Sequence, residues 1–337
     1  MNHLTQRIGI LTLFVLLVLS GCGINPQTKG ADDALTVFCS LEERPQVEWI
    51  LNQLFNDTLF TPEPEPYYKV HFNEPEDFLR FKMFANLVVV SIGSDPTNPA
   101  TNLAKRLLAP AVYEESLTGT EHLFLTLEPY ARNQVLLVIS GNTAEEIVAS
   151  IPHRREDIKK LMEEQFLQRQ RESLFPRRSQ KKLEQKLFKK YQWSLRIPPD
   201  FVVVKEDAER GLYWLGREDP YRWLVVHWEP GDVVADSLQA VEYARTFPLK
   251  MLTDTRYNDY QFKVEPTEFN DWYGWRFTGL WESITEAKGG PFIAYLFYDG
   301  LTDRTYYFHL MIFHPGKKKY LLLRQLDIIA HTFYVEQ

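Results

Sequence analysis

The chain has 337 residues, of which 45% are apolar and 14% aromatic, and its formal net charge is -7. This apolar content is enough for two hydrophobic cores, so the composition indicates a folded protein with two domains. The acidic balance argues against nucleic acid as a partner, because nucleic-acid-binding domains usually carry an excess of Lys and Arg.

Residues 1–21 have the pattern of an export signal. Arg7 precedes an uninterrupted apolar run from Ile8 to Leu19, and small residues follow this run. A helix over the run spans about 18 Å, well short of the roughly 30 Å hydrocarbon core of a bilayer. A cleaved signal peptide therefore fits the run better than a permanent transmembrane helix.

The end of this signal carries a second motif. The segment Leu19-Ser20-Gly21-Cys22 resembles the lipobox of bacterial lipoproteins, in which the cysteine is lipidated and the chain is cleaved in front of it. The resemblance implies acylation of Cys22 by fatty acids such as palmitate, and a membrane partner bound through that anchor. An ordinary secretory signal with an incidental cysteine is the alternative. Because Gly23 rather than an aspartate follows, and no acidic run comes next, similarity to known sorting rules favours a periplasm-facing position on the outer membrane.

The next segments predict a tether and a first domain. Residues 22–33 are polar and aperiodic, which is typical of a flexible tether. Residues 34–152 alternate strand-like and helix-like runs, and this order predicts a small N-terminal α/β layer domain with a mixed sheet. Thr143 and Glu146 form a capping-box pattern at the start of a long helix.

Residues 153–190 predict a basic helical connector. They contain 13 Lys or Arg against 6 Asp or Glu, a net charge of +7, so the rest of the chain carries -7 - 7 = -14. Pro176 divides the segment into two helices. The basic face is either a solvated bridge between two domains or a surface that lies against anionic phospholipids.

Residues 191–337 contain strand-like runs in series, with one helix after Asp236 and another at the end. This order predicts a C-terminal antiparallel sheet covered by helices, so the fold class of the chain is α+β. The order of elements loosely resembles the PsbP/Mog1-like fold.

The stretch GLWESITEAKGGPF, Gly279 to Phe292, combines a Trp-Glu pair with a Gly-Gly-Pro break. Together with the C-terminal stretch PGKKKYLLLRQLDIIAHTF, it resembles a family of uncharacterised lipoproteins of Bacteroidota-type bacteria that carry a domain of unknown function. The likeness covers most of the mature chain and is sharpest in GLWE, a short spacer and GGPF. It implies a fold and a location but no catalytic residue. We expect Gly289 and Gly290 to supply the positive φ of a hairpin tip.

The candidate ligand-binding residues are Trp275, Trp281 and Glu282. Alternate residues of the strand that ends at Trp281 are largely aromatic, so one strand face is an aromatic row. This row is core beneath the helices, a groove for a lipid, glycan or peptide, or a contact between the two domains. Glu282 would orient a ligand, or act as a general acid if it is buried near Asp299 or Asp303.

Other chemical motifs are weak. We find no Walker loop, dinucleotide fingerprint or zinc motif, so no cofactor is expected. His309 and His314 lie five residues apart in a strand and face opposite sides, which disfavours a metal site. Ser140 lacks the flanking glycine of a nucleophile elbow. Cys39 ends an apolar run, where a thiol usually packs as a small hydrophobe, and lipidation of Cys22 would leave it without a disulfide partner.

Three functions fit this sequence. The favoured one is a non-catalytic envelope lipoprotein that binds a protein, lipid or glycan partner. The alternatives are a hydrolase-like enzyme with an unrecognised site and a structural envelope scaffold. A polar pocket with converging carboxylates would favour the enzyme, an aromatic groove the binding protein, and a featureless surface the scaffold.

Overall fold

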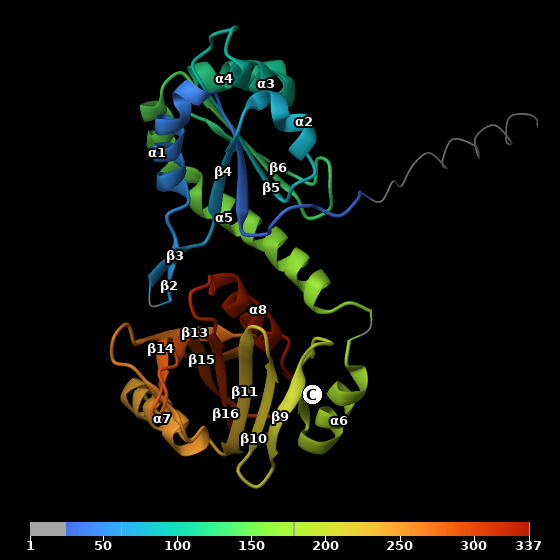
Figure 1. Cartoon of the computed structure of the whole chain (residues 1–337), viewed down its shortest axis with the longest axis vertical. Helices are drawn as coiled ribbons and strands as arrows, with labels where there is room; N and C mark the ends of the chain where they lie inside the picture. The colour runs from blue at the N-terminus through green and yellow to red at the C-terminus, as the bar shows by residue number, and fades with distance from the viewer. Residues whose placement is uncertain (1–24, 62, 178, 337) are drawn as a thin grey trace, which may run out of the picture.

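The computed structural model describes residues 25–61, 63–177 and 179–336, and it contains two sheet-based bodies joined by a long helix (Figure 1). The expected signal peptide, Cys22 and Gly23 lie outside the described residues. Within the described residues, no helix is both long and apolar enough to cross a membrane. The α+β fold class is confirmed.

The first body is built on a five-stranded mixed sheet in the order β4-β1-β5-β7-β6. Strands β4, β1, β5 and β7 are parallel to one another, and β6 is antiparallel to β7. Every residue of β7 is buried, which is typical of a parallel strand covered on both faces. The strands are β1 (Ala34–Phe38), β4 (Lys69–Asn73), β5 (Asn86–Ile92), β6 (Leu123–Leu127) and β7 (Val135–Gly141).

Helices cover both faces of this sheet and divide its core in two. On one face, the strands pack against α1 (Arg44–Leu54) and α5 (Ala144–Leu174). On the other face, they pack against α2 (Phe78–Phe81), α3 (Pro99–Leu107) and α4 (Pro110–Thr118). Short 3-10 turns at Leu41–Glu43 and Pro75–Asp77 lead into α1 and α2. This arrangement is the small α/β layer domain that the alternation of runs predicts.

The flexible tether expected over residues 22–33 is wrong for its described part. Residues from Asn25 onward lie along the first body and form hydrogen bonds with it. Lys29 donates its backbone N–H to the Met83 carbonyl at 2.8 Å, and its own carbonyl accepts from Ala85 at 3.1 Å. Backbone pairing of this kind needs no side-chain periodicity, so a polar aperiodic sequence gives no sign of it.

The long helix α5 begins where the capping pattern places it, since Thr143 Oγ1 accepts the Glu146 N–H at 3.2 Å. It runs without a break through residue 153, the expected start of the connector, although Pro152 lies inside it. It ends at Leu174, before Pro176, and α6 (Lys181–Tyr191) follows. The expected division of the basic segment into two helices is therefore confirmed.

The second body is built on an eight-stranded antiparallel sheet in the order β12-β14-β15-β16-β11-β10-β9, with β13 also paired to β14. One face packs against α7 (Ser237–Met251), and the other against α6 and α8 (Tyr320–Ala330). The short strands β8 (Trp193–Ser194) and β17 (Tyr334–Val335) pair with each other and pack on the same face of the sheet as α6 and α8. The strands of the sheet are β9 (Val202–Asp207), β10 (Leu212–Arg217), β11 (Tyr221–Pro230), β12 (Thr255–Tyr257), β13 (Lys263–Phe269), β14 (Trp272–Ser283), β15 (Gly289–Asp299) and β16 (Arg304–Phe313).

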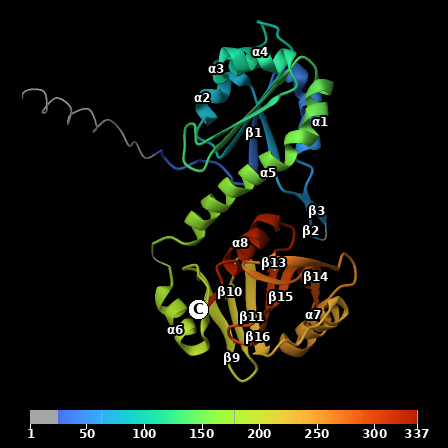
Figure 2. The same cartoon turned by 180° about the vertical axis from the view of Figure 1, so that it is seen from behind.

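The two bodies meet where a hairpin of the first reaches α8 of the second, as both views show (Figures 1 and 2). This hairpin consists of β2 (Thr58–Thr61) and β3 (Glu63–Pro66). The buried carboxylate of Glu65 accepts the backbone N–H groups of Lys319 at 2.8 Å and Tyr320 at 2.9 Å, at the start of α8. Tyr67 stacks on Tyr320 with ring centroids 4.3 Å apart. A residue of one body thus caps a helix of the other.

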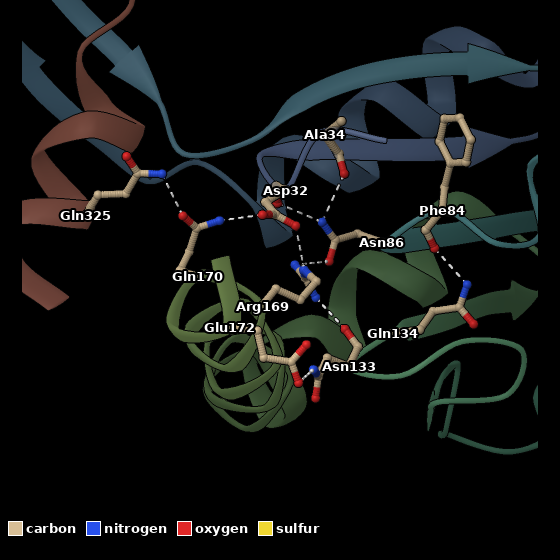
Figure 3. A network of polar contacts seen from close by, with 10 residues as sticks. All are labelled: Asp32, Ala34, Phe84, Asn86, Asn133, Gln134, Arg169, Gln170, Glu172 and Gln325. Atoms are coloured by element: carbon tan, nitrogen blue, oxygen red, sulfur yellow. Dashed lines mark hydrogen bonds and ion pairs between the residues drawn. The ribbon is translucent and has the colours of Figure 1, made fainter. Parts of the chain in front are cut away.

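A polar network continues this contact toward the N-terminal segment (Figure 3). The Asp32 carboxylate accepts from Arg169 Nε at 2.7 Å and from the side-chain amide of Gln170, both on α5. The Gln170 carbonyl accepts in turn from Gln325 of α8 at 2.8 Å. Arg169 is only 6% exposed and also donates to Asn86 at 3.2 Å. The network links the N-terminal segment, the long helix and the second body.

Candidate functional site

A pocket of about 720 Å³ lies between α7 and the end of the sheet formed by β10 and β11. This volume is within the range of small-molecule sites, about 300 to 1,000 Å³. We call it the α7 pocket. It is lined by residues 208–211 of the β9–β10 turn, residues 227–230 of β11, Val233, Tyr243, Thr246, Phe247, Lys250 and Met251, and Arg304 of β16.

Strand alternation places the polar groups of the α7 pocket. His227 and Glu229 are two residues apart in β11, so they share the strand face that α7 covers. Tyr243 faces them from α7, whose start is fixed by Asp236, since Asp236 Oδ1 accepts the Gln239 N–H at 2.9 Å. The pocket wall therefore contains an imidazole, a carboxylate and a phenol.

Glu229 is the centre of this group. Its Oε1 accepts the Tyr243 hydroxyl at 2.6 Å and lies 3.8 Å from His227 Nε2. The other ring nitrogen of His227, Nδ1, lies 2.8 Å from the Gly211 carbonyl oxygen. A carbonyl only accepts, so Nδ1 must carry the proton of this hydrogen bond. In the neutral imidazole, Nε2 then presents a lone pair toward Glu229.

Gly211 is needed for this arrangement. Its φ is +58°, and a Cβ at this position would lie 2.0 Å from the Trp228 carbonyl oxygen. Any larger residue would therefore combine a strained backbone with a steric clash. The glycine allows the turn to bring its carbonyl to His227 and so determines which ring nitrogen faces the pocket.

The protonation of the pocket groups follows from their contacts. The pKa of Glu229 lies below its ordinary value, first because of His227, which stabilises the carboxylate only when Nε2 also carries a proton, and then because of the Tyr243 hydroxyl; burial acts in the opposite direction. Burial, and then the Glu229 carboxylate, raise the pKa of Tyr243 well above its ordinary value. Near neutral pH, the wall thus holds an ionised carboxylate that accepts from a neutral phenol.

The charges and the apolar wall define what the pocket can bind. The charged lining residues are the cations Arg210, Lys250 and Arg304 and the carboxylates Glu209 and Glu229. Phe247 and Met251 contribute apolar surface from α7. Such a cavity suits a small ligand that carries positively and negatively charged groups and an apolar part.

The structure places the expected site residue Trp281 in the core of the second body. This residue is only 4% exposed, and its Nε1 donates to the Ile312 carbonyl at 3.1 Å. It packs against Trp223 with ring centroids 5.9 Å apart. Trp275 is half-buried against the same core cluster, on the α7 side of the sheet.

Glu282 lies at the surface, beside the end of β14. Its carboxylate accepts from Arg256 Nε at 2.7 Å and from Asn258 Nδ2 at 3.0 Å. These bonds, that of Asn258 first, hold its pKa below the ordinary value. Glu282 pairs with Gly289 at one end of β15 and Asp299 lies at the other end, so the grouping needed for a general acid does not form.

The expected role of Gly289 and Gly290 is wrong. Both belong to β15, Gly289 as its first residue, and neither is among the residues with positive φ. A Cβ on Gly290 would lie 2.1 Å from the Ile312 carbonyl oxygen, the atom that accepts from Trp281. The reason for glycine here is the close approach of neighbouring strands, which a turn-like sequence does not reveal.

The residues that line the α7 pocket were not singled out from the sequence. His227 and Glu229 carry one signal, since an HWE run in a strand puts both side chains on one face. Nothing in the sequence connects them to Tyr243 or Gly211, because those contacts depend on how α7 and the β9–β10 turn pack. Cys39, another residue considered, is fully buried, and burial raises its thiol pKa to about 11.

Comparison with known proteins gives a family match for the second body. Residues 179–332 match a domain of unknown function, DUF4837. The match begins just before α6 and ends just after α8, so it includes the whole α7 pocket. It also includes Trp275, Trp281 and Glu282. No curated protein matches the chain.

Solved structures give a more distant likeness. The Saccharomyces cerevisiae Ran-binding protein Mog1p is 14% identical, and the match covers 43% of this chain and 90% of that one, with a TM-score of 0.31. LpqN of Mycobacterium tuberculosis, described as involved in cell envelope biogenesis, is 12% identical over 43% of this chain and 83% of that one, with a TM-score of 0.31. TM-scores of this size carry no argument about function.

Proposed function

We propose that this protein is a non-catalytic binding module of the cell envelope, and that the α7 pocket holds its ligand. The observation that carries the proposal is the pocket itself: it measures about 720 Å³, and its lining combines the polar group of His227, Glu229 and Tyr243 with apolar side chains of α7. Cavities that combine apolar surface with a few converging polar groups are the usual form of small-molecule sites.

The protonation of the wall supports binding over catalysis. A general acid or base works best when its pKa lies near the working pH. The pKa of Glu229 is shifted down and that of Tyr243 up, so both move away from neutrality. Groups whose pKa lies far from neutrality keep the same charge whether a ligand is bound or not, so they suit recognition of a ligand.

The location is proposed from the sequence. Acylation at Cys22 would place the protein on the outer membrane, facing the periplasm. Asn25 and Pro26 already contact the first body, through the Glu128 carbonyl at 3.2 Å and the Arg132 N–H at 2.9 Å. Three residue steps span at most about 11 Å, so the anchor would hold the body close to the bilayer. Mass spectrometry of the mature chain should find acyl mass at Cys22, and a chain without it would refute the anchor.

A variant that fills the α7 pocket tests the proposal that this pocket binds a ligand. Thr246 lines the α7 pocket, and Thr246→Trp should occupy much of its volume, while Thr246→Ser keeps the space open. Small molecules should be extracted from each full-length protein after purification and compared by mass spectrometry. We expect a compound that wild type and Thr246→Ser retain and Thr246→Trp loses at an unchanged melting temperature. Equal retention by all three proteins, or no retained compound in any, would contradict the proposal.

A further inference from the structure

We infer that the α7 pocket selects a zwitterion, a small molecule with a primary ammonium group next to a carboxylate, such as a free amino acid or the end of a short peptide. This inference rests on the proposed function and adds the ligand class. It starts from the gap between His227 Nε2 and Glu229 Oε1, which measures 3.8 Å.

Both atoms that face this gap are acceptors when the imidazole is neutral. The Gly211 carbonyl fixes the proton of His227 on Nδ1, so Nε2 offers a lone pair. Glu229 is an ionised carboxylate, and the only hydrogen bond that its Oε1 accepts among the described residues comes from Tyr243. Two acceptors at this distance repel each other unless a donor satisfies both. Either His227 takes a second proton, or a ligand supplies a donor.

A primary ammonium group fits this position by charge and by number of donors. It carries three N–H groups and a positive charge, so one group can donate to Nε2 and to Glu229 together. A hydroxyl has one proton and no charge, and it can satisfy only one of the two acceptors. The Glu229 carboxylate adds the electrostatic attraction that favours a cation.

Other residues that line the α7 pocket favour a ligand with a carboxylate next to its ammonium group. Arg210 donates from Nη2 to the Lys250 carbonyl, so the guanidinium lies against the last turn of α7. Lys250 is exposed and close enough to act on the Glu229 carboxylate. Lys250 near the Glu229 carboxylate, and Arg210 against the same turn of α7, would disfavour a simple amine, and they suit a ligand that carries its own anion. Phe247 and Met251 leave room for an apolar side chain.

Four related probes separate the two charged groups of the ligand. Leucine carries both, N-acetyl-leucine lacks the ammonium, leucinamide lacks the carboxylate, and glucose lacks both. Calorimetric titration of the full chain, first stripped of bound small molecules, should show binding of leucine. Loss of either charged group should weaken binding by about tenfold or more, since a charge-assisted hydrogen bond has roughly that effect. Equal binding of leucine and N-acetyl-leucine, or no binding of leucine, would overturn the inference.

Two variants locate the site. Glu229→Gln keeps the shape and an acceptor for Tyr243 but removes the charge, and it should weaken leucine binding by about tenfold. Glu282→Gln changes a carboxylate of the same sheet that pairs with Arg256 instead, and it should leave binding unchanged. The opposite result would move the site to Glu282. Binding of glucose at the α7 pocket would refute the zwitterion and leave the proposed function standing.

Discussion

At the scale of single residues, His309 is a buried polar group without compensation. It is fully buried in β16, and neither ring nitrogen has a hydrogen-bond partner in the described structure. Aromatic rings surround it, with Tyr257 at 5.4 Å and Phe292 at 5.6 Å between ring centroids. Burial lowers its pKa from 6.5 to about 3, so the ring stays neutral in the folded protein.

This burial predicts a pH-dependent loss of stability. Between about pH 6.5 and pH 3, the unfolded chain binds a proton at this residue and the folded chain does not. The free energy of unfolding should therefore fall as the pH falls, by up to about 1.4 kcal/mol per pH unit from this group. His309→Leu should remove that contribution and leave stability at pH 7 unchanged or higher, because it deletes an unsatisfied polar group. Denaturant unfolding of both proteins from pH 7 to pH 4 measures this difference.

The same experiment can contradict the interpretation of His309. If His309→Leu lowers stability at pH 7 by about 2 kcal/mol or more, the imidazole must have a favourable partner such as a buried water. An identical pH slope in both proteins would show that the ring takes up a proton as readily in the folded chain as in the unfolded chain. Either result would change the assignment of His309 as an uncompensated core residue.

At the scale of elements, α8 begins with a cap from another part of the fold. The Glu65 carboxylate on the β2–β3 hairpin accepts the first N–H groups of α8, where the helix dipole also favours a negative charge. Lys319 Nζ lies 4.0 Å from the same side chain. The hairpin therefore stabilises a helix that follows it by some 250 residues in the sequence.

Removing this cap should weaken the whole chain. We expect Glu65→Ala to lower the free energy of unfolding by about 1 to 2 kcal/mol, the usual value of an N-cap with a favourable charge. Glu48→Ala, at an exposed position of α1, should stay within about 0.5 kcal/mol of wild type. Chemical denaturation of the three proteins gives the comparison. If the loss for Glu65→Ala is no greater than that for Glu48→Ala, the hairpin contributes little to α8.

The elements also show how far the sequence is informative. Alternation and apolar runs predicted the mixed sheet and the antiparallel sheet, because local periodicity reports which side of an element is buried. Pro176 predicted the break between the two helices of the basic segment. The polar segment before Ala34 was mispredicted, since its backbone pairs with distant loops. Gly290 was misassigned for a related reason: its neighbour is Ile312, on another strand.

At the scale of the whole molecule, the contacts between the two bodies cross the expected domain boundaries. Helix α5 passes through residue 153 without interruption, and Glu163 on α5 pairs with Arg324 on α8. Independent folding of residues 34–152 and residues 191–337 stays a prediction. The α7 pocket belongs to the second body alone, on the sheet face opposite α8.

The site shows the limit of prediction more sharply than the fold does. Trp281 was a candidate ligand-binding residue because it lies in an aromatic row. In the structure it is a core residue with only 4% of its surface exposed. The pocket instead joins a strand, a turn and a helix at His227, Gly211 and Tyr243. A single sequence gives no information on such a convergence, because the three segments meet only through tertiary packing.

Hydrogen–deuterium exchange tests the central claim, that the α7 pocket binds the ligand, most directly. The full chain should be stripped of small molecules and measured before and after the extracted compounds are returned. We predict slower exchange in residues 208–211 and 243–251, which line the pocket, and no change in residues 256–258 and 281–289 around Glu282. Protection confined to residues 256–258 and 281–289, or no protection in either region, would contradict the assignment of the α7 pocket as the binding site.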